Sequence, residues 1–215
     1  MKPLFLLLWI LVYCGKGIGQ PQFSIITGVR TGLPASPYGA FINRSRADEF
    51  YFSMVRYGSQ FCVGIQVEVP LREPFFVEAG LRHTQGTAFY RAKYTYASGF
   101  PNYIPHDMAE RMQAIASVLN MGARLGNIIV HSGFSITQPF HVTNEFALMH
   151  GFHEEATPPI VGWQMGIGLC PNRFSIRLEA GSMLSRVCRG RYIGDQSLEL
   201  KHTAPHFSCM VGYRL

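Results

Sequence analysis

His206 and Ser208 come closest, by type and spacing, to a catalytic pair in this chain. A serine hydroxyl becomes a nucleophile when a histidine takes its proton and a carboxylate, here Glu199, orients the imidazole ring. Side chains two positions apart in a strand point to the same face, so the two residues would share one environment. We predict a polar pair on the inner side of a sheet and no catalytic residues.

A second group of reactive side chains lies in one segment, between Pro139 and Pro158. It contains three histidines and three glutamates: His141, His150, His153, Glu145, Glu154 and Glu155. Their spacing matches no template of metal ligands. We therefore predict a solvated polar loop, no metal and no cofactor.

Length and composition predict one domain with a surface of low charge. Of the 215 residues, 15% are charged and 47% hydrophobic, whereas an ordinary soluble domain is about 25% charged. The net charge of +6 falls to +4 when the predicted signal peptide, with two lysines and no acid, is removed, which is too weak and too dispersed to support nucleic-acid binding. Four cysteines follow the N-terminal region without metal-ligand spacing, and we predict no disulfide among them: Cys62, Cys170, Cys188 and Cys209.

The N-terminal residues have the features of an export signal. Lys2 precedes an apolar stretch from Leu4 to Tyr13, and Gly17-Ile18-Gly19 provides a small-x-small cleavage site. The apolar stretch is too short for a spanning helix, which needs about 20 residues. We predict a signal peptide at 1–19 and a mature domain at 20–215.

Eight segments alternate between apolar and small or polar residues with a period of two, which indicates β-strands. They are Phe23–Arg30, Gln60–Val69, Pro74–Tyr96, Met112–Ala123, Ile128–Ile136, Pro159–Cys170, Phe174–Gly181 and Phe207–Leu215. The segment His106–Met121 is also rich in helix formers, so an amphipathic helix is the alternative there. We favour a strand, because the compact turn that follows leads directly into the next strand.

Short and long connections between these strands alternate along the chain. The short ones are 71–73, 124–127 and 171–172; the long ones are 31–59, 97–109, 139–158 and 186–205. Tight turns at one end and large loops at the other are typical of membrane barrels. The predicted fold class is therefore all-β, an eight-stranded antiparallel up-and-down transmembrane β-barrel with short periplasmic turns and long extracellular loops.

The two faces of the strands differ in charge, although alternation alone does not say which face is inside. Glycines and charges of both signs on the polar face favour a narrow interior in which acids and bases pair. We predict lipid-facing residues at Phe61, Val63, Ile65, Val67, Val161, Trp163, Met165, Ile167, Phe207, Val211 and Tyr213. We predict a lumen charge network of Glu68, Glu78, Arg82, Arg177, Glu179 and Arg214, with the glutamates paired to the arginines across the barrel.

The signal, the eight strands and the closing segment Val211-Gly212-Tyr213-Arg214-Leu215 resemble the small outer-membrane β-barrel family, in particular PorT-like and OmpX/OmpA-type barrels of Gram-negative bacteria. The resemblance covers residues 20–215, and Leu215 departs from the phenylalanine that often ends such barrels. It implies export through the inner membrane by a cleaved signal peptide and residence in the outer membrane, beside its lipids and lipopolysaccharide.

We expect a non-enzymatic barrel, plugged by its side chains and not a general pore, that acts as a binding or assembly component of the cell envelope. Other outer-membrane or secretion proteins are its expected partners. The first alternative is a hydrolase that modifies lipid A, since some barrels of this family deacylate lipid A with a His-x-Ser pair. The second alternative is a secreted, soluble barrel of the lipocalin kind, with the apolar face inside.

Overall fold

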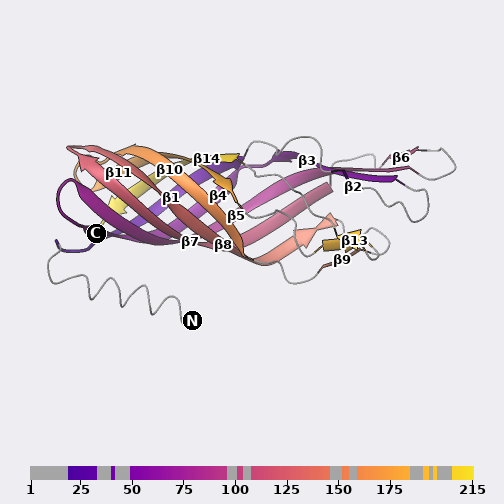
Figure 1. Ribbon diagram of the computed structural model, residues 1–215, viewed down its shortest axis with the longest axis horizontal. Helices are drawn as coiled ribbons and strands as arrows, with labels where there is room; N and C mark the ends of the chain where they lie inside the picture. Colours follow the sequence, from indigo (N-terminus) through magenta and orange to yellow (C-terminus); the bar gives the residue numbers. More distant parts are fainter. Residues whose placement is uncertain are drawn as a thin grey trace.

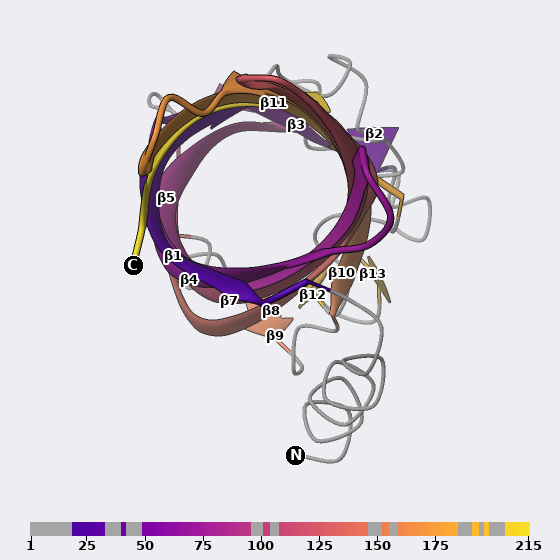
Figure 2. The same cartoon turned by 90° about the vertical axis from the view of Figure 1, so that its left-hand side faces the viewer.

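The computed structural model shows a closed β-barrel, seen end-on as a ring in Figure 2. The structure describes residues 19–32, 40–41, 49–95, 101–103, 108–145, 152–154, 159–184, 191–193, 196–197 and 205–215. Residues 1–18 of the predicted signal peptide, Cys188 and Glu199 lie outside the described residues. No helix in the described part of the chain is long and apolar enough to span a membrane.

Eight strands form the barrel, which confirms the predicted fold class. They are β1 (Gln22–Gly32), β4 (Gln60–Pro70), β5 (Phe75–Thr95), β7 (Met108–Leu125), β8 (Ile128–Asn144), β10 (Ile160–Leu169), β11 (Phe174–Met183) and β14 (Pro205–Arg214). Each strand pairs antiparallel with the next along the chain. The last strand pairs with the first, from Ser24 opposite Arg214 to Gly32 opposite His206, and this pairing closes the ring. Closure leaves no unpaired edge between the barrel strands.

The segment from Met108 to Leu125 is a strand, as predicted, in spite of its helix-forming residues. It lies between β5 and β8 and pairs with both over most of its length. Its side chains alternate between buried and exposed from Ala114 to Met121. Pairing with two neighbours therefore overrides the local preference for helix.

Three tight turns lie at the same end of the barrel as the two ends of the chain's described part. They connect β4 to β5, β7 to β8 and β10 to β11, and Gly126 and Asn172 adopt positive φ in the last two. The backbone N–H of Leu215 bonds the carbonyl of Phe23 at this end. The long connections, at the opposite end, contain short strands: β2 (Ala40–Phe41), β3 (Glu49–Tyr57), β6 (Pro101–Tyr103), β9 (Phe152–Glu154), β12 (Arg191–Ile193) and β13 (Gln196–Ser197).

The wall of the barrel has two heights (Figure 1). Strands β5, β7 and β8 have 21, 18 and 17 residues and form what we call the tall wall. Strands β10, β11 and β14 have 10 residues each and form the short wall. Strand β3 pairs with the upper part of β5, where Tyr57 stands opposite Ala88. Gly58 and Ser59 separate β3 from β4. The tall wall therefore continues beyond the closed ring as a sheet of paired strands.

Candidate functional site

The inside of the barrel carries the charged side chains that alternation placed on one face. Glu68, Glu78, Arg82, Arg177 and Glu179 are each 5% exposed or less. A buried charge is tolerated only when it is paired and hydrogen-bonded. Their partners therefore decide what this interior can do.

Arg82 and Glu179 form the most complete ion pair. The two guanidinium nitrogens Nη1 and Nη2 donate to the two carboxylate oxygens at 2.7 and 2.9 Å. Ser208 Oγ donates to the same carboxylate at 3.3 Å, and His131 Nε2 lies 3.4 Å from it. Strands β5 and β11 stand on opposite sides of the ring, so this pair spans the lumen. A bidentate arrangement of this kind fixes geometry as well as charge.

Glu78 and Arg177 form a second ion pair between the same two strands, with the charges exchanged. The other oxygen of Glu78 accepts a hydrogen bond from Asn120 Nδ2 at 3.0 Å. Asn120 Oδ1 in turn accepts from Gln164 Nε2 at 3.1 Å. The chain of contacts therefore runs from β11 across the lumen to β5, and then through β7 to β10.

Glu68 pairs with Arg124, near the end of the barrel that carries the tight turns. Arg124 Nη2 donates to Glu68 Oε1 at 2.6 Å. The prediction gave Glu68 a partner among Arg82, Arg177 and Arg214 and placed Arg124 in a turn. The structure corrects this, because β7 continues through Leu125 and so carries Arg124 into the barrel. Arg214 is half-buried at the end of β14, and no ion pair joins it to a carboxylate among the described residues.

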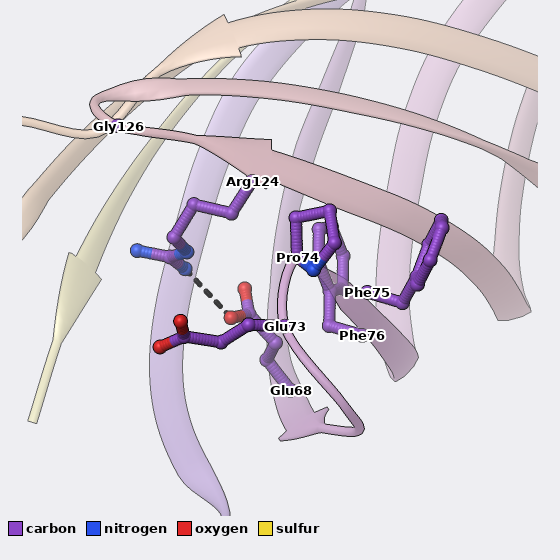
Figure 3. A pocket seen from close by; sticks show the side chains of 7 residues that line it. All are labelled: Glu68, Glu73, Pro74, Phe75, Phe76, Arg124 and Gly126. Atoms are coloured by element: carbon purple, nitrogen blue, oxygen red, sulfur yellow. Dashed lines mark hydrogen bonds and ion pairs between the residues drawn. The ribbon is translucent and has the colours of Figure 1, made fainter.

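A recess of about 300 Å³ lies beside this third pair (Figure 3). It is lined by Glu68, Glu73, Pro74, Phe75, Phe76, Arg124 and Gly126. In Figure 3 the carboxylate of Glu73 lies on the same side as the Glu68–Arg124 pair. The recess mixes acids, a base and two aromatic rings, and it opens at the end with the tight turns.

Glycines on the inner face give the long side chains room to meet. Gly133 stands in register between Asn120 and Gln164, and a Cβ there would come within 2.5 Å of Asn120 Oδ1. Gly166 likewise stands between His131 and Glu179, and a Cβ there would come within 2.6 Å of the His131 ring. In both cases a residue without a side chain lets its two neighbours interact above it.

The outer face of the barrel is apolar. Nine of the eleven residues predicted to face lipid are at least 39% exposed, with Ile65 the most exposed at 61%. The remaining two, Val67 and Trp163, are partly exposed on the same faces. No charged residue occupies an outward position in β10, β11 or β14. The protein therefore has a polar interior and an apolar exterior, the reverse of a soluble barrel.

His206 and Ser208 both point into the barrel, where they are 7% and 5% exposed. Ser208 contacts Glu179, as described above, and Glu199 lies outside the described residues. A serine that attacks a membrane lipid would have to face outward. The structure therefore groups this pair with the interior network.

Asn120, His131 and Gln164 belong to the interior network but were absent from the predicted site. All three occupy inward positions of their strands. Extending the alternation to every polar residue of the strands, not only to the charged ones, would have found them. Their partners could not have been found in this way, because contacts across a ring depend on the register of several strands.

No family model matches this chain, and no curated protein matches it. Among solved structures it is similar to the outer membrane protein OprG from Pseudomonas aeruginosa, at 10% identity over 93% of this chain and 98% of that chain, with a TM-score of 0.48. It is similar to the outer membrane protein Ail of Yersinia pestis, at 12% identity over 91% and 100%, with a TM-score of 0.37. The translocator domain of the autotransporter NalP from Neisseria meningitidis matches at 9% identity over 100% and 95%, with a TM-score of 0.40. At these values the similarities define neither a family nor a function for this chain.

Proposed function

We propose that this protein is a barrel of the Gram-negative outer membrane that spans the bilayer with its eight strands. The observation that carries the proposal is the reversal of polarity, with ion pairs inside and large apolar side chains outside. Soluble monomers rarely expose continuous apolar patches larger than a few hundred Å², whereas here the apolar surface recurs on strand after strand. A soluble barrel of the lipocalin kind would need the opposite arrangement.

The lumen is plugged by side chains and does not form a general pore. An eight-stranded barrel has an interior just wide enough for side chains to fill. The Arg82–Glu179 and Glu78–Arg177 pairs cross this space between opposite strands. Planar-bilayer recordings should therefore show no large, stable openings, and such openings would contradict the plugged lumen.

Within the envelope the protein acts as a binding or assembly component and not as an enzyme. The long connections and the upper part of the tall wall lie at the end opposite the tight turns. They offer surfaces to outer-membrane lipids, lipopolysaccharide or other envelope proteins. The inward positions of His206 and Ser208 disfavour the lipid A hydrolase. The resemblance to PorT-like barrels stays a prediction, which co-purification of secretion components from native membranes would test.

Membrane residence can be tested on the natural sequence without a substitution. After removal of the predicted signal peptide, Trp163 is the single tryptophan of the chain. It lies on the outward face of β10, beside Val161 and Met165. In vesicles whose acyl chains carry bromine, Trp163 fluorescence should be quenched, while iodide in the water should have little effect. Strong quenching by iodide alone would contradict the proposal.

Fractionation provides an independent control. The protein should require detergent for extraction and should migrate differently on a gel before and after heating, since a closed barrel resists unfolding by detergent. Extraction in plain buffer would favour the secreted, soluble alternative.

A further inference from the structure

The outer face of the tall wall changes character part of the way up. As far as Leu81, Ile115 and Ile136, its outward positions are mostly apolar. Beyond them, towards the long connections, most outward positions are polar, with Phe89 and Phe140 as exceptions. In a membrane barrel this boundary lies where the acyl chains end and the headgroups begin.

Six polar residues form two rows on this upper surface, which we call the polar shelf. Gln85, Gln113 and His141 lie side by side on β5, β7 and β8, and Thr87, Arg111 and Thr143 form the adjacent row. Four of the six are exposed, and Thr87 and Gln113 are partly exposed. Given the spacing of strands and of residues along them, the shelf measures about 10 by 7 Å, roughly the size of one or two sugar rings.

The short wall has no such surface. Apart from Ser182, its described outward positions remain apolar at the corresponding end, where Val161 is 39% and Phe207 is 50% exposed. Among the described residues, the polar shelf lies on the side of the barrel where paired strands continue beyond the apolar belt.

The chemistry of the shelf fits a phosphorylated sugar. The guanidinium of Arg111 can form two parallel hydrogen bonds with a phosphate. Amides and hydroxyls both donate and accept hydrogen bonds, as sugar hydroxyls require. Phe140, 56% exposed at a bulge in the β7–β8 pairing, lies with its ring 5.9 Å from that of His83 and offers an apolar face at the lower edge of the shelf. The nearby carboxylate of Glu145 accepts a hydrogen bond from the backbone N–H of Ala109 at 3.0 Å.

We propose that the polar shelf binds the phosphorylated sugar headgroup of a glycolipid in the outer leaflet. The inference rests on the proposed membrane location. The shelf adjoins the apolar belt, so a glycolipid can bury its acyl chains against Leu81, Ile115 and Ile136 while its headgroup meets Arg111. A headgroup of this kind carries both the phosphate and the sugar hydroxyls that the two rows match.

The test measures which lipids stay bound to the purified protein. The protein, expressed in a Gram-negative host and purified in detergent, is exchanged against bisphosphorylated lipid A, dephosphorylated lipid A or phosphatidylglycerol. Bound lipid is counted by native mass spectrometry. We expect bisphosphorylated lipid A to be retained, and we expect Arg111→Gln to weaken its retention about fivefold. The matched control is Arg72→Gln, which removes the same charge from the exposed turn between β4 and β5 and should leave retention unchanged.

Each other outcome decides against part or all of the proposal. Equal loss in Arg72→Gln and Arg111→Gln would show a general effect of net charge and overturn the site. Equal retention of phosphatidylglycerol would overturn the sugar specificity. The charge-neutral double substitution Gln85→Leu and Gln113→Leu should also reduce retention, and wild-type retention in this variant and in Arg111→Gln would overturn the shelf. Heat-dependent migration and Trp163 quenching, measured on the same samples, show whether the barrel itself is folded in the membrane.

Discussion

The short wall and the tall wall follow different physical constraints. A strand tilted by about 45° needs about 9–11 residues to cross a bilayer, and β10, β11 and β14 have 10 residues each. Strands β5, β7 and β8 have 17 to 21. The thickness of the bilayer therefore accounts for the length of the short wall, whereas pairing between neighbouring strands sustains the excess length of the tall wall.

The largest expected effect comes from breaking the link between the two walls. Glu179→Ala leaves Arg82 buried without its carboxylate, and we expect a loss of about 3–5 kcal/mol in the free energy of unfolding. Urea unfolding in lipid vesicles, followed by Trp163 fluorescence, measures this loss. Replacing both partners with leucine should cost less than the single change. A single variant as stable as the wild type would contradict the pairing.

A charge on the outer face should distinguish the walls directly. Met165→Arg places a cation at the centre of β10, in the apolar face of the short wall. The expected cost is about 2–4 kcal/mol near the middle of the bilayer. Gln85→Arg, on the polar part of the tall wall, should change stability by less than about 0.5 kcal/mol. The same unfolding assay compares the two variants, and equal costs would mean that both positions meet the same medium.

A methyl group added at Gly166 should clash with atoms of both walls. The added Cβ would meet the His131 ring of the tall wall and the backbone oxygen of Leu178 in the short wall. Gly166→Ala should therefore cost about 1–3 kcal/mol through overpacking. Gly162→Ala on the same strand is the matched control, because its closest contact would be 3.1 Å. The temperature at which the folded gel band disappears on heating would rank the two variants. The reverse ranking would contradict the packing.

The smallest effect is expected at the end with the tight turns. The side chain of Arg124 is 29% exposed, so solvent screens its pair with Glu68. Arg124→Gln should cost no more than about 1 kcal/mol. Arg214→Gln, which breaks no ion pair with the described residues, should cost less still. A loss for Arg124→Gln as large as that for Glu179→Ala would show that this pair is as well shielded from water as the interior ones.

Much of the barrel could be predicted from alternation and from the lengths of the connections. The eight strands and the antiparallel ring follow from these two signals. The partners of the charges do not, because alternation fixes which face a residue occupies but not its height relative to a strand on the far side. Glu68 meets Arg124 for another reason, because β7 continues beyond its predicted end and carries Arg124 into the barrel two strands from β4. The added strands β2, β3 and β6 could not be predicted either, since they depend on pairing with a tall wall that extends beyond the ring.

The exchanged order of charge in the two crossing pairs protects the barrel against misassembly. Sliding β11 by two residues would keep every side chain on its proper face, so alternation could not oppose this error. It would, however, bring Arg177 opposite Arg82, or, in the other direction, Glu179 opposite Glu78. Either slip brings like charges together in the buried interior, where their repulsion is poorly screened. The sequence Arg177-Leu178-Glu179 therefore meets opposite charges on β5 in the native alignment and like charges after a shift of two residues.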